Sequence, residues 1–218
     1  MSAFPGSPKL LKGGLVLIDP ETSAVKKIIP LQYNPDNLTR SLQVKGVGGE
    51  GAGSRSEPLR LTGPPVETLK LEIEIDATDL LETGDTQTSQ VGIQPQLSVL
   101  ESIVYPSSAS LISNNSLAQS GTIEITPMET DLTLFIWSKE RILPVRITEF
   151  SITEESFDPN LNPIRAKVSI GMRVLNVDDL GFDHKGGGLF MSYHQNKERL
   201  AGLFKQGNLA DLGINSIP

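Results

Sequence analysis

The histidines and carboxylates of this chain are the residues whose types could support catalysis or metal binding. Neither His184 nor His194 stands in a zinc-binding spacing such as His-Glu-x-x-His. Asp178, Asp179, Asp183 and His184 form one local cluster, but it lacks the regular oxygen spacing of a calcium-binding loop. We therefore expect these acids to be solvated linker residues and expect no metal site.

A pair of glutamates is the other candidate for chemistry. Glu72 and Glu74 are two positions apart in an alternating segment, so their side chains share one strand face at a spacing of about 7 Å. Two carboxylates could act as an acid/base pair, but we interpret these two as part of a solvated strand face. The chain has no cysteine, no Gly-x-Ser-x-Gly elbow and no phosphate-binding Gly-Lys-Ser/Thr. We expect no catalytic residues, no cofactor and no enzymatic activity.

The composition limits the class of partner. The chain has 218 residues, 38% of them hydrophobic, and a formal net charge of −7. This length suits one sandwich or barrel domain with appended segments. The negative charge and the lack of a basic face argue against nucleic-acid binding. We also expect no signal peptide, no membrane insertion and, from the lack of cysteine, a cytoplasmic site of assembly.

The elements that would position these residues are mainly strands. Residues 68–76 alternate between apolar and charged side chains and predict a half-buried strand. Residues 144–158 and 162–174 predict a long hairpin, with a β-bulge near Thr148 and Glu149. Residues 131–137 predict a strand that is buried on both faces. Further strands are expected at residues 15–18, 25–33, 39–44 and 122–125.

Helical spacing of apolar residues predicts two helices. One covers residues 95–105 and packs on the sheet, and the other runs from Leu189 to about Gln206 after a glycine cluster. The polar segment 79–94 is expected to be a loop, and the Ser- and Asn-rich segment 107–120 is expected to be a surface excursion. The C-terminal helix is expected either to dock on a partner or to pack back onto its own sheet. The candidate docking residues are Leu189, Tyr193, Leu200, Leu203 and Phe204.

A glycine-rich segment at residues 46–55 is too costly in conformational entropy to order by itself. It is expected to be either a flexible loop or an arm that orders against a neighbouring subunit. In the long hairpin, the outward row that contains Arg165 and Lys167 is expected to pair with Glu149, Glu154 and Glu155 on the opposite strand.

Four segments, in this order, resemble the tube and baseplate-hub protein family of contractile injection systems, which are phage-tail-like particles. They are residues 31–38 with Tyr33-Asn34-Pro35, residues 61–76, residues 132–137 ending in Trp137, and residues 157–168 with Pro163-Ile164-Arg165-Ala166. The resemblance implies a mainly β (α+β) class, a phage tail-tube-like β-sandwich or barrel with one packed helix and a C-terminal helical tail. The tube-like domain would cover residues 1–178, and residues 179–218 would form a helical docking extension.

The resemblance also implies a function and partners. Subunits of such a protein form a six-fold ring through continued strand pairing. Residues 179–218 are shorter than and unlike the LysM module that similar members often carry. The C-terminal extension and the long Ser/Thr-rich insertions favour a tube initiator or spike-to-tube adaptor that lacks this module, because repeating tube subunits tend to be compact. The expected function is a baseplate ring that joins the inner tube to the central spike and transmits contraction force. An ordinary inner-tube subunit is the alternative, and a soluble carbohydrate-binding β-sandwich is an alternative of another class.

The expected partners are copies of the chain itself, the inner-tube protein, the spike protein and other baseplate proteins of a bacterial particle. The residues expected at the contacts between subunits belong to the glycine-rich segment, the strand that ends in Trp137 and the long hairpin. They are Gly46, Gly49, Gly51, Arg55, Phe135, Trp137, Arg141, Arg165 and Lys167.

Overall fold

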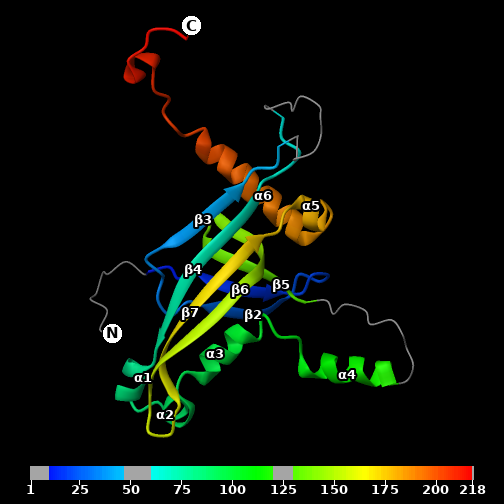
Figure 1. Ribbon diagram of the computed structural model, residues 1–218, viewed down its shortest axis with the longest axis vertical. Helices are drawn as coiled ribbons and strands as arrows, with labels where there is room; N and C mark the ends of the chain where they lie inside the picture. The colour runs from blue at the N-terminus through cyan, green and yellow to red at the C-terminus, as the bar shows by residue number, and fades with distance from the viewer. Residues whose placement is uncertain (1–9, 47–59, 120–129, 218) are drawn as a thin grey trace, which may run out of the picture.

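Seven antiparallel strands form one sheet in the order β2-β1-β5-β6-β7-β4-β3 (Figure 1). The structure is a computed structural model that describes residues 10–46, 60–119 and 130–217. The strands are β1 (Gly14–Ile18), β2 (Val25–Pro30), β3 (Leu38–Gln43), β4 (Val66–Asp76), β5 (Leu132–Ser138), β6 (Arg141–Phe157) and β7 (Pro163–Val174). The mainly β, α+β class expected from the sequence is confirmed.

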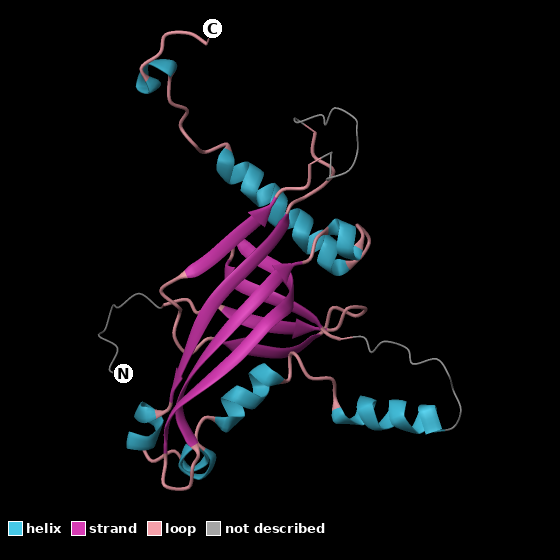
Figure 2. Ribbon diagram, viewed as in Figure 1, coloured by secondary structure: helices cyan, strands magenta, loops and turns pink. Residues whose placement is uncertain are grey.

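The sheet is strongly twisted, so that strands β1, β2 and β5 cross the direction of strands β3, β4 and β7 (Figure 2). Strand β6 belongs to both parts, because its first residues pair with β5 and its remaining residues pair with β7. The register with β7 shifts between Ile147 and Glu149. This shift confirms the predicted β-bulge, and a bulge bends the strand that carries it.

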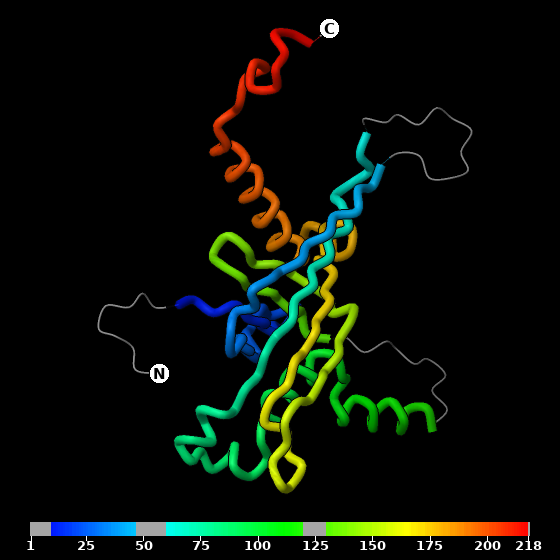
Figure 3. Tube along the Cα trace, turned by 60° about the vertical axis from the view of Figure 1, so that its left-hand side comes forward, coloured from blue at the N-terminus to red at the C-terminus, as the bar shows by residue number. Residues whose placement is uncertain are grey.

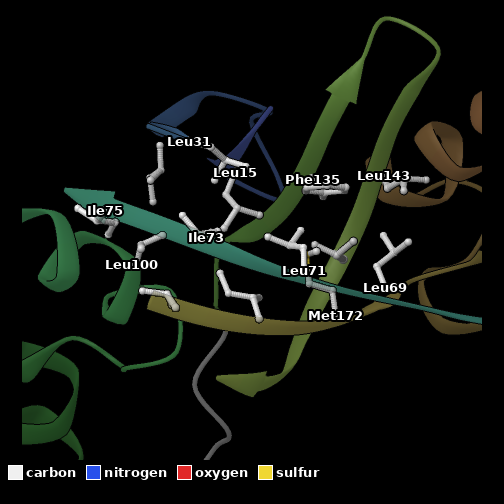
Figure 4. Packing of buried hydrophobic residues seen from close by; sticks show 14 of the residues in the cluster. Leu15, Leu31, Leu69, Leu71, Ile73, Ile75, Leu100, Phe135, Leu143 and Met172 are labelled. Atoms are coloured by element: carbon white, nitrogen blue, oxygen red, sulfur yellow. The ribbon is translucent and has the colours of Figure 1, made fainter. Parts of the chain in front are cut away.

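The main core lies between the two parts of the sheet. Strand β4 contributes one buried face, Leu69, Leu71, Ile73 and Ile75, as its alternation predicts. Leu15 and Leu31 pack in the same cluster from the β1–β2 side (Figure 4). Burying an aliphatic side chain of this size stabilises a fold by about 1.5–3 kcal/mol, so this cluster is the main source of stability.

Strand β5 is buried on both faces, which also confirms the sequence prediction. Phe135 packs in the main core, whereas Leu132 and Leu134 belong to a second cluster on the opposite face. Leu180 and Leu189 cover that second cluster. The segments that follow β7 therefore complete the burial of the sheet.

The helices are α1 (Thr78–Glu82), α2 (Thr86–Val91), α3 (Gln94–Glu101), α4 (Ser108–Gln119), α5 (Val177–Leu180) and α6 (Lys185–Ala201), with a 3₁₀ turn, η1 (Leu209–Leu212). Helix α3 is the predicted core helix and buries Leu97 and Leu100. The described residues contain no helix with the length and apolar character of a membrane span.

The expectation that residues 79–94 form a loop was wrong, because α1 and α2 form there. Residues 107–120, expected to be a surface excursion, contain the helix α4. The Asp85 carboxylate caps α2 by accepting a hydrogen bond from the Thr88 amide at 2.7 Å. Helix α4 buries none of its residues. The polar composition that suggested loops therefore reflects helices with little or no buried face. The predicted strand at residues 122–125 lies outside the described residues.

Helix α6 begins earlier than expected, since its first turn includes the glycine cluster. His184 caps the helix by accepting a hydrogen bond from the Gly186 amide at 3.0 Å. A Cβ atom at Gly187 would lie 1.9 Å from the carbonyl oxygen of Gly181. Glycine therefore allows the start of α6 to pack against the turn after α5, and the chain beyond α6 projects away from the sheet (Figure 3).

Candidate assembly surfaces

Helix α6 is fixed to the sheet by a buried carboxylate. Glu67 of β4 is only 3% exposed. Its carboxylate accepts a hydrogen bond from the Tyr193 hydroxyl at 2.9 Å and another from Lys197 Nζ at 2.8 Å. Arg40 Nε of β3 lies 3.8 Å from the same carboxylate, and Lys197 Nζ lies 4.0 Å from the centroid of the Tyr193 ring. These contacts join α6 to the β3–β4 edge of the sheet.

A second carboxylate holds α6 to the β5–β6 hairpin. Glu140 receives a hydrogen bond from Arg199 Nη2 at 2.8 Å and another from the Asn196 side chain. The hydrogen bond from Asn196 and the nearby Arg199 lower the pKa of Glu140. Glu140 is exposed, so the ion pair contributes little stability. Together, Glu67 and Glu140 orient the helix across two parts of the sheet.

The five candidate docking residues divide into two groups. Tyr193 is buried against the sheet, as is its helical neighbour Phe190, and Leu189 is half-buried. Of the two sequence-based alternatives for this helix, the structure thus has the one in which it packs on its own sheet. Leu200, Leu203 and Phe204 are exposed at the end of the helix and just beyond it. Only these three are accessible to a partner.

The outer strands β2 and β3 form the two edges of the sheet. Among the described strands, each has a pairing partner on one side only, β1 for β2 and β4 for β3. Edge strands present backbone N–H and C=O groups that can pair with another chain. Both edges carry exposed apolar side chains, Val25 and Ile28 near β2 and Leu42 and Val44 near β3. Both edges therefore combine free backbone groups with apolar side chains among the described residues.

Ion pairs organise the outer face of the long hairpin. The Arg165 guanidinium binds the Asp76 carboxylate, with Nη2 at 2.6 Å and Nε at 2.8 Å. Burial acts to raise the pKa of Asp76, but hydrogen bonds from Thr78 and Arg165 outweigh it and lower this pKa. The hydrogen bond with Asp76 in turn raises the pKa of Arg165. Arg165 therefore pairs with β4, not with the glutamates of β6.

Lys167 pairs with a glutamate of the opposite strand β6, as the sequence predicts. Its Nζ lies 3.7 Å from the Glu155 carboxylate on β6. A different lysine, Lys70 of β4, lies 3.5 Å from Glu149. Both pairs are exposed and contribute little to stability. Arg165 and Lys167 thus lie on an accessible face of the sheet, where a neighbouring subunit could contact them.

The aromatic residues proposed for the interface lie at different depths. Phe135 is 1% exposed and packs within the main core, so its assignment to the interface requires correction. A neighbouring subunit cannot reach this ring in the folded domain. Trp137 is half-buried and stacks on Phe135 with ring centroids 5.9 Å apart. Arg141 is half-buried at the start of β6.

The glycine-rich segment leaves the sheet at an extension of the β3–β4 hairpin. Gly46 forms a β-bridge with Leu61, and the Thr62 amide donates to the carbonyl of Lys45 at 3.0 Å. Lys45 Nζ lies 2.9 Å from Asp178. These contacts fix the base of the segment. The other proposed interface residues of the segment, Gly49, Gly51 and Arg55, lie outside the described residues.

Three of the residues considered for chemistry, Asp178, Asp179 and His184, serve as helix caps or ion-pair partners. Asp179 closes the capping box of α5 with Asn176 and also binds Arg173 at 2.7 Å. Asp178 binds Lys45, and His184 caps α6. Within residues 10–46, 60–119 and 130–217, no group of three or more His, Asp or Glu side chains could hold a metal ion.

Sequence reasoning did not identify Glu67, although the sequence holds a signal for it. Glu67 has the same phase as Leu69 and Leu71, so its side chain points to the core face of β4. A charged residue at a core position requires a partner. The partners come from α6, more than 120 residues later, and nothing in the strand pattern predicts them.

Comparison with known families gives one match. Residues 16–179 match the family model described as contractile injection system tube protein. The matched segment begins in β1, ends in α5 and includes the whole of the sheet except the first residues of β1. None of the curated proteins compared with the chain matches it.

Proposed function

The chain belongs to the contractile injection system tube protein family, and we propose that within such a particle it forms the ring that joins the inner tube to the central spike. The family membership makes the chain a structural component that assembles with other parts of a phage-tail-like particle. In the proposed position, the ring would be six-fold, and it would transmit the force of sheath contraction to the spike.

The two sheet edges support the proposal of a ring. Because β2 and β3 lie at opposite edges of one sheet, the β3 edge of one subunit can pair with the β2 edge of the next. Such a contact joins different surfaces of the two partners. A series of these contacts closes into a ring when the rotation between successive subunits is a whole fraction of a full turn. Exposed Ile28 and Leu42 would be covered in this arrangement.

The C-terminal extension supports an adaptor over an ordinary tube subunit, and it is the observation that carries the proposal. Helix α6 and the residues after it lie beyond the matched segment. The helix is anchored through Glu67 and Glu140, while Leu203 and Phe204 remain exposed. A subunit that repeats along a tube needs only its ring and stacking contacts, whereas an adaptor needs an additional surface.

Affinity purification of the tagged full chain from its native cells tests this position. After mild cross-linking, mass spectrometry should identify both the spike protein and the inner-tube protein as direct neighbours. Recovery of inner-tube and sheath proteins without the spike protein would contradict the adaptor position. It would favour the ordinary tube subunit instead.

A further inference from the structure

Strand β6 lies inside the sheet only over its first residues. Residues 141–145 pair with β5, whereas residues 146–157 pair with β7 alone among the described strands. We call residues 146–157 distal β6. Successive residues of a strand direct their backbone groups to opposite sides, so about half of the N–H and C=O groups of distal β6 point to a side without a described strand. The sheet therefore has a third edge in addition to β2 and β3.

The apolar face of distal β6 is incompletely covered. Phe150 and Ile152 pack against the main core cluster but are only half-buried. Their cross-strand partners on β7, Ile170 and Val168, are 1% and 0% exposed. Strand β7 has a neighbouring strand on each side, whereas distal β6 has a described neighbour on one side only. A strand added at this edge would complete the burial of the apolar row.

Distal β6 is also acidic. It contains Glu149, Glu154 and Glu155 but only one basic residue, Arg146. Glu149 and Glu155 lie within 4 Å of lysines, whereas Glu154 is exposed and forms no ion pair within the described part of the chain. Glu154 has the same phase as Phe150, so its side chain lies on the apolar face. A strand that suits this edge therefore needs apolar residues and a basic residue on one face.

Strand β3 of the same chain has this pattern. It contains no acidic residue, and Leu38, Arg40 and Leu42 pair with core-facing residues of β4 and so share one face. Leu42 and Val44, the next residue of this phase, are 47% and 67% exposed. Arg40 Nε lies 3.8 Å from the Glu67 carboxylate, yet 40% of the Arg40 side chain is exposed. Arg40 is therefore accessible to a carboxylate of a neighbour.

We propose that distal β6 receives strand β3 of the next copy of the chain, in an antiparallel pair. One register suits both faces of the two strands. Its pairs on the apolar face are Arg40 with Glu154, Leu42 with Ile152, and Val44 with Phe150. On the outer face, the exposed Ser41 and Thr153 lie opposite each other. A shift by one residue would place the apolar side chains of β3 on the polar face, so the alternation fixes this phase.

Strand direction and charge favour distal β6 over β2 as the strand that receives β3. Because each neighbouring pair is antiparallel, β3 runs opposite to distal β6. Rotation about a ring axis along these strands keeps their directions, so β3 of one copy is antiparallel to distal β6 of the next. Strand β2 instead crosses the direction of β3 (Figure 2). Its charged residues, Lys26 and Lys27, are basic like Arg40, and like charges across a strand pair are destabilising.

The inference rests on the proposed ring and names the strand that receives β3. In such a ring, the strands β3, β4, β7 and distal β6 of each copy would continue into those of the next copy as one closed sheet. Two edges with free backbone groups would then be paired, which removes two sites of unspecific association. The edge of β2 would stay available to another component of the particle.

Cross-linking of two full-length double variants in particles purified from the native cells tests the pairing. The chain has no cysteine, so Ser41→Cys with Thr153→Cys introduces its only thiols, on β3 and distal β6. Ser41→Cys with Ile28→Cys is the matched control, since Ile28 is an exposed residue of β2. Within one chain, β4 and β7 separate β3 from β6 by three strand spacings, about 14 Å. A bis-maleimide linker shorter than this joins Ser41→Cys to Thr153→Cys only between copies.

The variant with Thr153→Cys should form a ladder of covalent multimers at least about tenfold faster than the variant with Ile28→Cys, because strand pairing raises the effective concentration of the thiols. Mass spectrometry of the linked peptides identifies the joined residues. Equal rates, or faster cross-linking through Ile28→Cys, would overturn the inference and leave the ring intact.

Light scattering of the purified chain separates failure of the pairing from failure of the ring. If neither variant forms multimers but both keep the mass of a ring, the inference is overturned and the ring stands. A wild-type chain with the mass of a monomer would contradict the proposed ring and, with it, the pairing. Circular dichroism of each variant verifies that the fold is retained.

Discussion

Glu67 and Lys197 are 130 positions apart in sequence, yet the carboxylate of one lies 2.8 Å from the ammonium nitrogen of the other. The Tyr193 hydroxyl completes this contact from the same helix. Tertiary packing, not helix propensity, therefore sets the position of α6. The orientation of residues 202–217 depends on this contact, because they continue directly from the helix.

The first prediction concerns this contact. Glu67→Gln keeps the shape of the side chain but removes the charge that faces Lys197 and Arg40. We expect the free energy of unfolding to fall by about 1–2 kcal/mol, since hydrogen bonds to charged groups are worth about 1.5–3 kcal/mol and Lys197 is partly solvated. Urea denaturation measures the loss, and hydrogen exchange should show faster exchange of the α6 amides.

Glu72→Gln is the matched control, because Glu72 lies on the solvent face of the same strand. Its free energy of unfolding should stay within about 0.5 kcal/mol of the wild type. Equal losses for Glu67→Gln and Glu72→Gln would show that the buried carboxylate does not anchor the helix.

The second prediction separates two adjacent glycines. Gly187→Ala places a methyl group against the carbonyl oxygen of Gly181, whereas a Cβ atom at Gly188 meets nothing within 4 Å. We expect Gly187→Ala to destabilise the protein by about 1–3 kcal/mol through overpacking. Gly188→Ala should stabilise it by up to about 1 kcal/mol through helix propensity. Thermal denaturation measures both, and the same sign for the two changes would contradict the packing at Gly187.

The third prediction concerns the pH dependence of stability. The pKa of Asp76 is lower in the folded state than its value of about 3.9 in the unfolded chain. Its ionised form therefore stabilises the fold above pH 4, and this contribution is lost as the pH falls through the folded-state pKa. Asp76→Asn should make the free energy of unfolding fall less steeply between about pH 5 and 2.

Arg165→Gln is the companion variant for this prediction. It removes one of the donors that lower the pKa of Asp76. The free energy of unfolding should therefore also fall less steeply in acid, though the change should be smaller than for Asp76→Asn. Unfolding by urea at a series of pH values gives the slopes. If the free energy of unfolding of both variants depends on pH in acid as that of the wild type does, the ion pair does not contribute to acid stability.

The fourth prediction concerns the β3 edge. Leu42→Asp places a charge on an exposed side chain at the proposed contact between subunits. The assembled ring should weaken while the free energy of unfolding changes by no more than about 0.5 kcal/mol. Light scattering after size exclusion measures the mass. Leu161→Asp, in the exposed turn between β6 and β7, is the control and should leave the mass unchanged.

The sequence predicts those strands and helices in which the burial of one face leaves a periodic pattern of apolar residues. The alternation of Leu69 to Ile75 identifies β4 and its buried face, and the change of phase after Ile147 identifies the bulge. Both features follow from the two-residue period of a strand, which is visible in any sequence with one buried face.

The features that were missed depend on contacts between distant segments or on helices with little buried surface. Helix α4 has no apolar periodicity because it buries no residue. Phe135 was assigned to an interface because both faces of β5 are apolar, but the second face is covered by Leu180 and Leu189 of the same chain. The partners of Glu67 become apparent only when α6 is placed on the sheet.

The copy number of the chain in purified particles tests the proposed adaptor position most directly. Quantitative mass spectrometry should compare the chain with the sheath protein in particles sorted by length. If the chain forms the single ring between tube and spike, its copy number per particle should stay constant as the sheath lengthens. A copy number that rises in proportion to the sheath protein would identify an ordinary tube subunit and contradict the adaptor.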